Sequence, residues 1–151
     1  MIIAVGCDHA GFVLKDSVLR FLKENAEIID CGVFTEARVD YPDIAIEAAR
    51  RVSEGKADLG VLMCGTGIGV SIAANKVRGI RAGVCNDIQA AKFGKAHNNL
   101  NVICLGGRVI DASQVNGILS VWLGTPFEGG RHLERIDKIS AAEDSFSGVG
   151  R

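Results

Sequence analysis

The sequence predicts an α/β fold in three layers, with helices on both faces of a parallel sheet. Two observations carry this prediction: five short runs rich in Ile, Val or Leu recur along the chain, and longer stretches with helical periodicity separate them. Continuous apolar runs are typical of parallel strands, because helices cover both faces of such a sheet. Strands that alternate with helices in this way build βαβ units with right-handed crossovers.

The expected elements follow in chain order. The strands cover residues 2–6, 27–31, 59–64, 81–85 and 101–106, and each ends on Gly or Cys. The helices cover residues 12–25, 41–53, 69–76, 88–96, 112–123 and 134–143. Leu14, Val18 and Leu22 share the apolar face of the first helix. Pro42 suits the first turn of the second helix. Asp87 and Asp111 are N-cap candidates for the fourth and fifth helices.

Length and composition indicate one domain, at residues 1–144, followed by a loose tail at residues 145–151. With 151 residues, of which 48% are hydrophobic, the chain can bury a core. The net charge of −1 indicates neither a nucleic-acid partner nor an acidic membrane. The first residues lack a signal-peptide pattern, and no apolar run approaches about 20 residues. We therefore expect a cytoplasmic protein with no membrane partner.

The five cysteines predict free thiols. Cys7, Cys31, Cys64, Cys85 and Cys104 are scattered, without the CxxC or Cys/His spacing of a zinc site. An odd number of cysteines in a chain without an export signal is typical of a reducing compartment. We expect neither a metal nor another cofactor.

Polar and glycine-rich residues follow the predicted strands, where ligands of parallel sheets bind. They occupy residues 6–11, 64–71, 85–87 and 106–108, with His97 and Asn98 between the fourth helix and the fifth strand. This distribution predicts a pocket at the carboxyl ends of the strands.

The stretch from Cys64 to Ser71 is the most informative of these segments. Glycines at positions 65, 67 and 69 let the backbone turn sharply and present N–H groups to an anion. The helix that follows adds unpaired donors and a positive dipole end, which should favour the thiolate form of Cys64. A plain strand-to-helix turn with a buried cysteine is the alternative, because a glycine-rich loop alone is a weak signal.

Several nucleotide and phosphatase motifs are excluded at this loop. Position 70 is Val, which breaks the GxGxxG spacing, and the loop belongs to the third βα turn rather than the first. No GxxxxGK[ST] sequence is present. A thiol phosphatase would need an arginine within the loop, but the next arginine is Arg78.

Other polar residues allow two interpretations each. Asp8 and His9 suit a base or sugar-binding pair, or else a helix cap and a solvated side chain. Arg131 and Arg135 are four residues apart and could share one helix face toward a phosphate, or form an ordinary ion-paired surface. His132 is interpreted as a surface residue. Tyr41 could pack in the core or against a sugar.

Taken together, these segments resemble the sugar-phosphate isomerase family that contains ribose-5-phosphate isomerase B and the galactose-6-phosphate isomerase subunits. The resemblance spans nearly the whole chain. It lies in the ordered combination of GCDHAGF at residues 6–12, DYP at 40–42, CGTGIG at 64–69, SIAANK at 71–76, GIRA at 79–82, HN at 97–98, GGR at 106–108 and GGRH at 129–132.

The resemblance implies a Rossmann-like, five-stranded parallel sheet in a homodimer, or a dimer of dimers, with active sites that draw residues from both chains. Cys64 matches the catalytic base, which moves a proton between C1 and C2 of a sugar phosphate through an enediolate. Thr66 and His97 match the residues that open the furanose ring. The loop amides of the family's enediolate site match Gly65, Gly67, Ile68, Gly69, Val70 and Ser71. The phosphate ligands match His9, Arg108, Arg131 and Arg135, and the residues around the sugar match Asp8, Tyr41 and Asn98.

Three alternatives remain at this point. The substrate could be a hexose 6-phosphate, allose or galactose, instead of ribose 5-phosphate. The chain could also be a non-catalytic subunit that binds phosphosugars, although the presence of Cys64, Thr66 and His97 argues against it. A nucleotide-binding module is disfavoured by the loop spacing.

Overall fold

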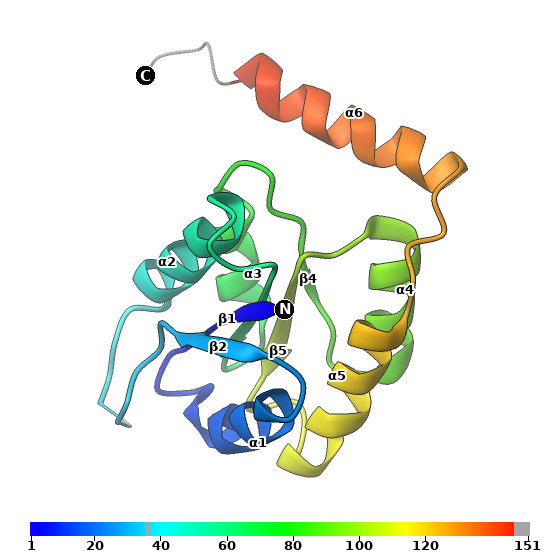
Figure 1. Cartoon of the computed structure of the whole chain (residues 1–151). Coiled ribbons are helices and arrows are strands. Elements are labelled where there is room, and N and C mark those ends of the chain that lie inside the picture. The colour runs from blue at the N-terminus through cyan, green and yellow to red at the C-terminus, as the bar shows by residue number, and fades with distance from the viewer. Residues whose placement is uncertain (36, 147–151) are drawn as a thin grey trace.

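The computed structural model describes residues 1–35 and 37–146 and confirms the predicted α/β fold (Figure 1). Five strands form one parallel sheet: β1 (Ile2–Cys7), β2 (Glu27–Asp30), β3 (Leu59–Cys64), β4 (Ala82–Val84) and β5 (Val102–Gly106). Their order across the sheet is β2-β1-β3-β5-β4, so β3 is central and β4 lies at an edge. Cys64, the last residue of β3, pairs with Gly106 at the end of β5.

The described residues also form six helices: α1 (Phe12–Lys23), α2 (Tyr41–Ser53), α3 (Ile68–Ala74), α4 (Ile88–Asn98), α5 (Val115–Gly124) and α6 (Arg131–Phe146). The N-cap predicted at Asp87 is confirmed, because its Oδ1 accepts a hydrogen bond of 2.8 Å from the Ala90 N–H. The helix expected at 112–123 begins instead as a 3₁₀ turn, Ala112–Gln114, which has Asp111 at its N-cap position.

The core divides into two clusters, one on each face of the sheet. Along β3, Val61 and Met63 belong to the cluster that includes residues of α1, α4 and α5, whereas Leu62 and Cys64 belong to the cluster with α2 and α3. This alternation is the period of two that a strand imposes on its side chains. Cys64 therefore faces the α3 side at the carboxyl end of the central strand.

Helix α6 lies away from the sheet, above β4 and beside the end of α4 (Figure 1). Its far end contacts the loop before β4: Arg78 pairs with Asp144, and the Gly79 N–H donates to Glu143 Oε2 at 3.1 Å. The helix starts three residues earlier than predicted and continues to Phe146, so the boundary expected at residue 144 falls inside it. Residues 147–151 of the expected tail lie outside the described residues.

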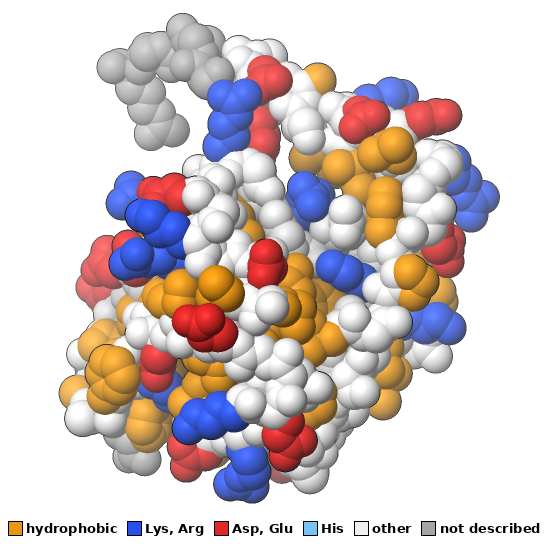
Figure 2. All heavy atoms as spheres, viewed as in Figure 1, with side chains coloured by type: hydrophobic (Ala, Val, Ile, Leu, Met, Phe, Trp, Pro, Cys, Tyr) orange, Lys and Arg blue, Asp and Glu red, His pale blue; other side chains and the backbone are white. Residues whose placement is uncertain are grey.

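Hydrophobic side chains also reach the surface between charged ones on the face shown in Figure 2. Four large examples lie on α3, α4 and α6 and are about half exposed, namely Ile72, Phe93, Leu133 and Ile139. None of the described helices has the length and apolar character needed to cross a membrane.

Candidate active site

A pocket of about 270 Å³ opens at the carboxyl ends of β1 and β3, as predicted for a sheet of this kind. It receives side chains from the loops that follow β1, β3 and β5 and from the first residue of α2. Its lining comprises Asp8, His9, Ala10, Tyr41, Cys64, Gly65, Thr66, Gly69 and Arg108. One chain thus brings together eight of the predicted site residues, while Gly67, Ile68, Val70 and Ser71 lie in the same loop and helix.

Cys64 lies at the base of the pocket with a backbone donor directed at its sulfur. The Gly67 N–H donates to Cys64 Sγ at 3.2 Å. Gly67 has a φ of 82°, a left-handed conformation that favours glycine and turns the chain into α3. The turn therefore directs a backbone donor at the sulfur of the cysteine that lines the pocket.

The loop after Cys64 is held by hydrogen bonds on both sides. Thr66 Oγ1 accepts from the Ile68 N–H at 3.2 Å, and the Asn86 side chain donates to Thr66 O at 3.1 Å. Asn86 Oδ1 in turn accepts from the Gly106 N–H at 2.7 Å, which ties the loop to the end of β5. Asn86 is therefore a supporting residue of the site, and its position directly after a predicted strand was the available sequence signal.

The other four cysteines are in environments that favour the neutral thiol. Burial raises the pKa of Cys7 to about 11 and that of Cys85 to about 12. Burial also raises the pKa of Cys31, and it raises the pKa of Cys104 well above its ordinary value. All five cysteines are free thiols. Cys64 is the one that lines the pocket.

Asp8 and His9 lie beside Cys64 at the end of β1. Asp8 Oδ1 accepts from the N–H groups of Ala10 and Gly11, both at 2.8 Å, so Asp8 caps the turn into α1 as one interpretation expected. The solvated alternative for His9 is wrong for one of its atoms, because Nδ1 is buried without a hydrogen-bond partner. An unpaired buried nitrogen on a pocket wall is a candidate contact for a ligand.

Tyr41 and Arg108 form two walls of the pocket against glycines of the Cys64 loop. A Cβ atom on Gly69 would lie 2.8 Å from the Tyr41 ring, so the absence of a side chain at 69 allows this contact. Arg108 packs over Gly65 in a similar way, with its Nη1 3.3 Å from the corresponding Cβ position. Tyr41 therefore lies at the site and not in the core.

Four predicted residues remain. They lie at the other end of the sheet, toward the amino ends of the strands: His97, Asn98, Arg131 and Arg135. Helix α4 begins after the carboxyl end of β4 and returns, so its last turn, with His97 and Asn98, lies near the start of β5. From Val102 to Gly106 the strand rises about 13 Å. Within one chain His97 therefore does not reach the pocket at the strand ends, and a site that takes residues from both chains stays a prediction.

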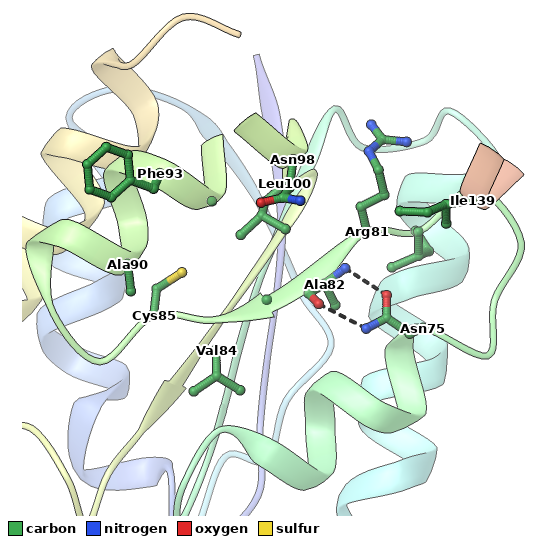
Figure 3. Close-up of a pocket in the computed structure, with 13 residues that line it drawn as sticks. Asn75, Arg81, Ala82, Val84, Cys85, Ala90, Phe93, Asn98, Leu100 and Ile139 are labelled. Carbon is green, nitrogen blue, oxygen red and sulfur yellow. Dashed lines mark hydrogen bonds between the residues drawn. The ribbon is translucent and has the colours of Figure 1, made fainter. Parts of the chain in front are cut away.

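A second pocket, of about 460 Å³, lies along the edge strand β4 beneath α6 (Figure 3). Its lining includes Asn98, Phe93 and Ile139. Asn75 closes one side, where its side chain forms two hydrogen bonds with the backbone of Ala82, one from the Ala82 N–H at 2.8 Å and one to its carbonyl oxygen at 2.9 Å.

His132 is buried, which corrects the prediction that it is a surface residue: its exposure is 4%. Its ring stacks on that of His97 with centroids 4.3 Å apart and planes 2° apart. Glu128 Oε2 lies 3.5 Å from His132 Nε2 and 3.7 Å from His97 Nε2. The prediction failed because the burial of His132 depends on where α6 docks against α4, and helical periodicity does not contain that information.

His97, Glu128 and His132 are the described residues whose ligand atoms come close enough to consider a metal. The nitrogen lone pairs of an imidazole lie in the plane of its ring, and the two parallel ring planes here do not meet at one ion. Arg131 also donates from Nε to His132 Nε2 at 3.5 Å, which places a cation where a metal would bind. The arrangement is therefore a stack with a carboxylate beside it and does not fit a chelating site.

Comparisons with known proteins agree with this geometry. Residues 3–139 match the family described as Ribose/Galactose Isomerase. The chain is 46% identical over 142 residues to ribose-5-phosphate isomerase B of Escherichia coli strain K12, which covers 93% of this chain and 95% of that protein. It is similar to the structure of Clostridium thermocellum ribose-5-phosphate isomerase B, with a TM-score of 0.94, 43% identity, and coverage of 97% of this chain and 99% of that one. The Mycoplasma genitalium ribose-5-phosphate isomerase B with bound ribulose-5-phosphate gives a TM-score of 0.90 at 40% identity, with coverage of 95% and 96%.

Proposed function

The chain belongs to the ribose/galactose isomerase family, and from that premise we propose that it interconverts ribose 5-phosphate and ribulose 5-phosphate with Cys64 as the base. The observation that carries this proposal is the position of Cys64 in its pocket. The Cys64 sulfur accepts a hydrogen bond from the Gly67 N–H, and the residue as a whole is 5% exposed. It lies among polar groups that follow the ends of three strands.

The reaction needs the ring to open before any proton leaves carbon. Ribose 5-phosphate is a furanose, so its O1 proton must be removed and its ring oxygen protonated to give the open-chain aldehyde. Thr66 and His97 take these two proton transfers in our proposal. Thr66 lines the Cys64 pocket, and histidine is the side chain that most often transfers protons in general acid–base catalysis.

Cys64 then moves the proton between carbons. Its thiolate removes the C2 proton, the electron pair forms the C1–C2 double bond of an enediolate, and the negative charge moves onto O1. The Cys64 thiol returns the proton to C1, while the O2 proton passes to O1, so that C2 becomes the ketone carbon and O1 becomes a hydroxyl. The sum of these steps converts the aldose to the ketose without a net change in protons or electrons.

Backbone amides at the start of α3 would hold the enediolate charge. Gly69 and Val70 are in the first turn, where N–H groups have no acceptor within the helix, and Gly69 lines the pocket. Preorganised donors of this kind typically contribute about 3 kcal/mol each to the transition state. The buried Nδ1 of His9 and the Arg108 guanidinium are the phosphate contacts available on this side.

We propose that two copies of the chain complete each site. His97 and Arg131 lie at the opposite end of the sheet from Cys64, about 13 Å of strand away. This separation exceeds the reach of a pentose phosphate between its second carbon and its phosphorus. In a symmetric dimer the end of the sheet that carries His97 in one copy can face the end that carries Cys64 in the other. The half-exposed Phe93 and Ile139, which line the second pocket, supply apolar surface for such a contact (Figure 3).

A reducing compartment, the cytoplasm, suits this chemistry. The base must be a free thiol, and none of the five cysteines is paired. A hexose 6-phosphate is the second candidate substrate, because the family that matches this chain includes galactose isomerases.

The proposal is tested by turnover of the purified protein on ribose 5-phosphate, allose 6-phosphate and galactose 6-phosphate. We expect ribose 5-phosphate to give the highest kcat/KM. Cys64→Ala should abolish turnover while phosphosugar affinity stays within a few-fold, because the arginines and loop amides remain. Cys64→Ser should be nearly as inactive, since a hydroxyl is too weakly acidic to act as the base at neutral pH.

Cys31→Ala is the matched control, because it removes a partly exposed thiol that does not line the pocket. It should retain full turnover. Appreciable turnover by folded Cys64→Ala would refute the cysteine base. Higher kcat/KM on a hexose 6-phosphate would replace the substrate.

A further inference from the structure

We propose that His132 is a positioning residue that fixes His97 and Arg131 relative to each other, so that ring opening and phosphate binding share one rigid unit. This inference rests on the function proposed above for His97 and Arg131. Neither the family resemblance nor the motif pattern assigns a role to this histidine. Its place in the structure does, through the three contacts described below.

The first contact is the ring stack. The His97 ring contacts two others: His132, with planes 2° apart and centroids 4.3 Å apart, and Phe93, 5.1 Å away at 30°. Phe93 and His97 are on the same helix, whereas His132 comes from α6. The stack of His97 on His132 therefore joins two helices and restricts the tilt of the His97 imidazole.

The second contact joins His132 to the arginine before it. Arg131 Nε donates to His132 Nε2 at 3.5 Å. A guanidinium has five N–H donors in a fixed fork, so the use of Nε leaves the terminal Nη groups for a phosphate. The acceptor orients the planar group, and the two outer nitrogens then have a defined direction.

The third of these is the set of charged and titratable groups that surround His132. Burial, His97 and Arg131 lower the pKa of His132, Glu128 opposes this effect, and Arg135 adds to it. These surroundings favour the neutral imidazole, whose Nε2 lone pair can accept from Arg131. A protonated His132 would lose this acceptor and would repel both arginines.

These contacts matter for catalysis because of the order of events. The phosphate must be held while His97 transfers a proton at the ring, and errors of about 1 Å in such an arrangement can cost on the order of 100-fold in rate. His132 touches both groups, so a displacement of its ring moves His97 and releases Arg131. Neither effect requires His132 to touch the sugar.

The test compares two reactions that differ in their need for ring opening. Ribulose 5-phosphate cannot form a furanose, because its C5 hydroxyl carries the phosphate, and exchange of its C1 proton with D₂O proceeds through the enediolate alone. Turnover of ribose 5-phosphate needs ring opening as well. NMR measures both rates on the same preparation, and thermal unfolding reports whether each variant is folded.

His132→Gln keeps an acceptor for Arg131 but loses the ring. We expect ribose 5-phosphate turnover to fall about tenfold or more while C1 exchange of ribulose 5-phosphate stays within about twofold. His132→Phe keeps a ring face against His97 but loses the acceptor. It should raise KM several-fold in both reactions and leave the ratio of their kcat values unchanged. Glu134→Gln, an exposed change on the same helix, is the matched control and should alter neither reaction.

His97→Gln sets the scale, because it should show the same split as His132→Gln to a greater extent. If His132→Gln lowers both reactions equally, or lowers neither, while the wild-type protein catalyses both, the inference is refuted and the proposed function stands. If His97→Gln shows no split, the inference also falls. A wild-type protein that catalyses neither reaction refutes the proposed function and the inference with it.

Discussion

Protomers with Cys64→Ala and protomers with His97→Ala should restore activity to each other, although each variant alone is inactive. The expectation follows from the placement of the two residues at opposite ends of the sheet, which about 13 Å of β5 separates. If each site takes Cys64 from one copy and His97 from the other, a mixed dimer contains one site with both substitutions and one site with neither.

The size of the recovery follows from this arrangement. Random assembly of equal amounts of the two variants produces mixed dimers as about half of the population, and half of the sites in each mixed dimer are intact. Activity should therefore reach about one quarter of the wild-type value per protomer. A dimer of dimers built from the same contact gives the same fraction.

The assay is co-expression of the two variants with different tags, followed by purification through both tags and turnover of ribose 5-phosphate. Selection for both tags should raise the specific activity to about one half of wild type, because only mixed dimers remain. The matched control pairs Cys64→Ala with Arg108→Ala. Both residues line the same pocket, so no combination of these two chains contains an intact site.

Recovery that stays at the background of the parent variants would refute the shared site. Background activity in the control pair alone supports it, whereas recovery in the control pair would show that Cys64 and Arg108 of one chain serve different sites. A fully active monomer in sedimentation would also overturn the argument.

Three further predictions concern single residues. A limiting amount of iodoacetamide should modify Cys64 first, since burial raises the pKa of the other four thiols. Ribose 5-phosphate should protect Cys64 from this reaction. Mass spectrometry of the peptides measures the order of labelling, and earlier labelling of another cysteine would contradict the prediction. Gly69→Ala should change the free energy of unfolding by less than about 1 kcal/mol, because helix propensity offsets the overlap with Tyr41, but it should raise KM as the ring is displaced. The lowered pKa of His132 means that the unfolded chain binds its proton more readily, so stability should decline as pH falls below about 6.5; thermal unfolding of His132→Gln should show a smaller decline.

The sheet was predictable because burial on both faces leaves a direct trace in the sequence. Each strand lies within one residue of its predicted bounds, and the Cys64 loop could be placed because ligands of parallel sheets bind after such strands. Elements with less apolar content were harder to delimit. The first turn of α6 contains Arg131 and His132, which a periodicity argument left outside the helix.

The spatial relation between the two groups of site residues was contained in the predicted order of elements. His97 precedes β5 and Arg108 follows it, so a parallel sheet places them at opposite ends of the strand. The burial of His132 is different, because it depends on contact between α4 and α6 and on the position of Glu128 beside two imidazoles. Tertiary contacts of this type leave no local pattern to read.

The clamp between Asn75 and Ala82 has a consequence for the behaviour of the protein at high concentration. β4 is an edge strand of three residues, and an open edge is a template for the addition of foreign strands. The Asn75 amide occupies both backbone groups of Ala82, so an incoming strand finds few partners there. The sheet is thereby protected against fibrous growth, and Asn75→Ala should increase aggregation on prolonged storage even if catalysis is unchanged.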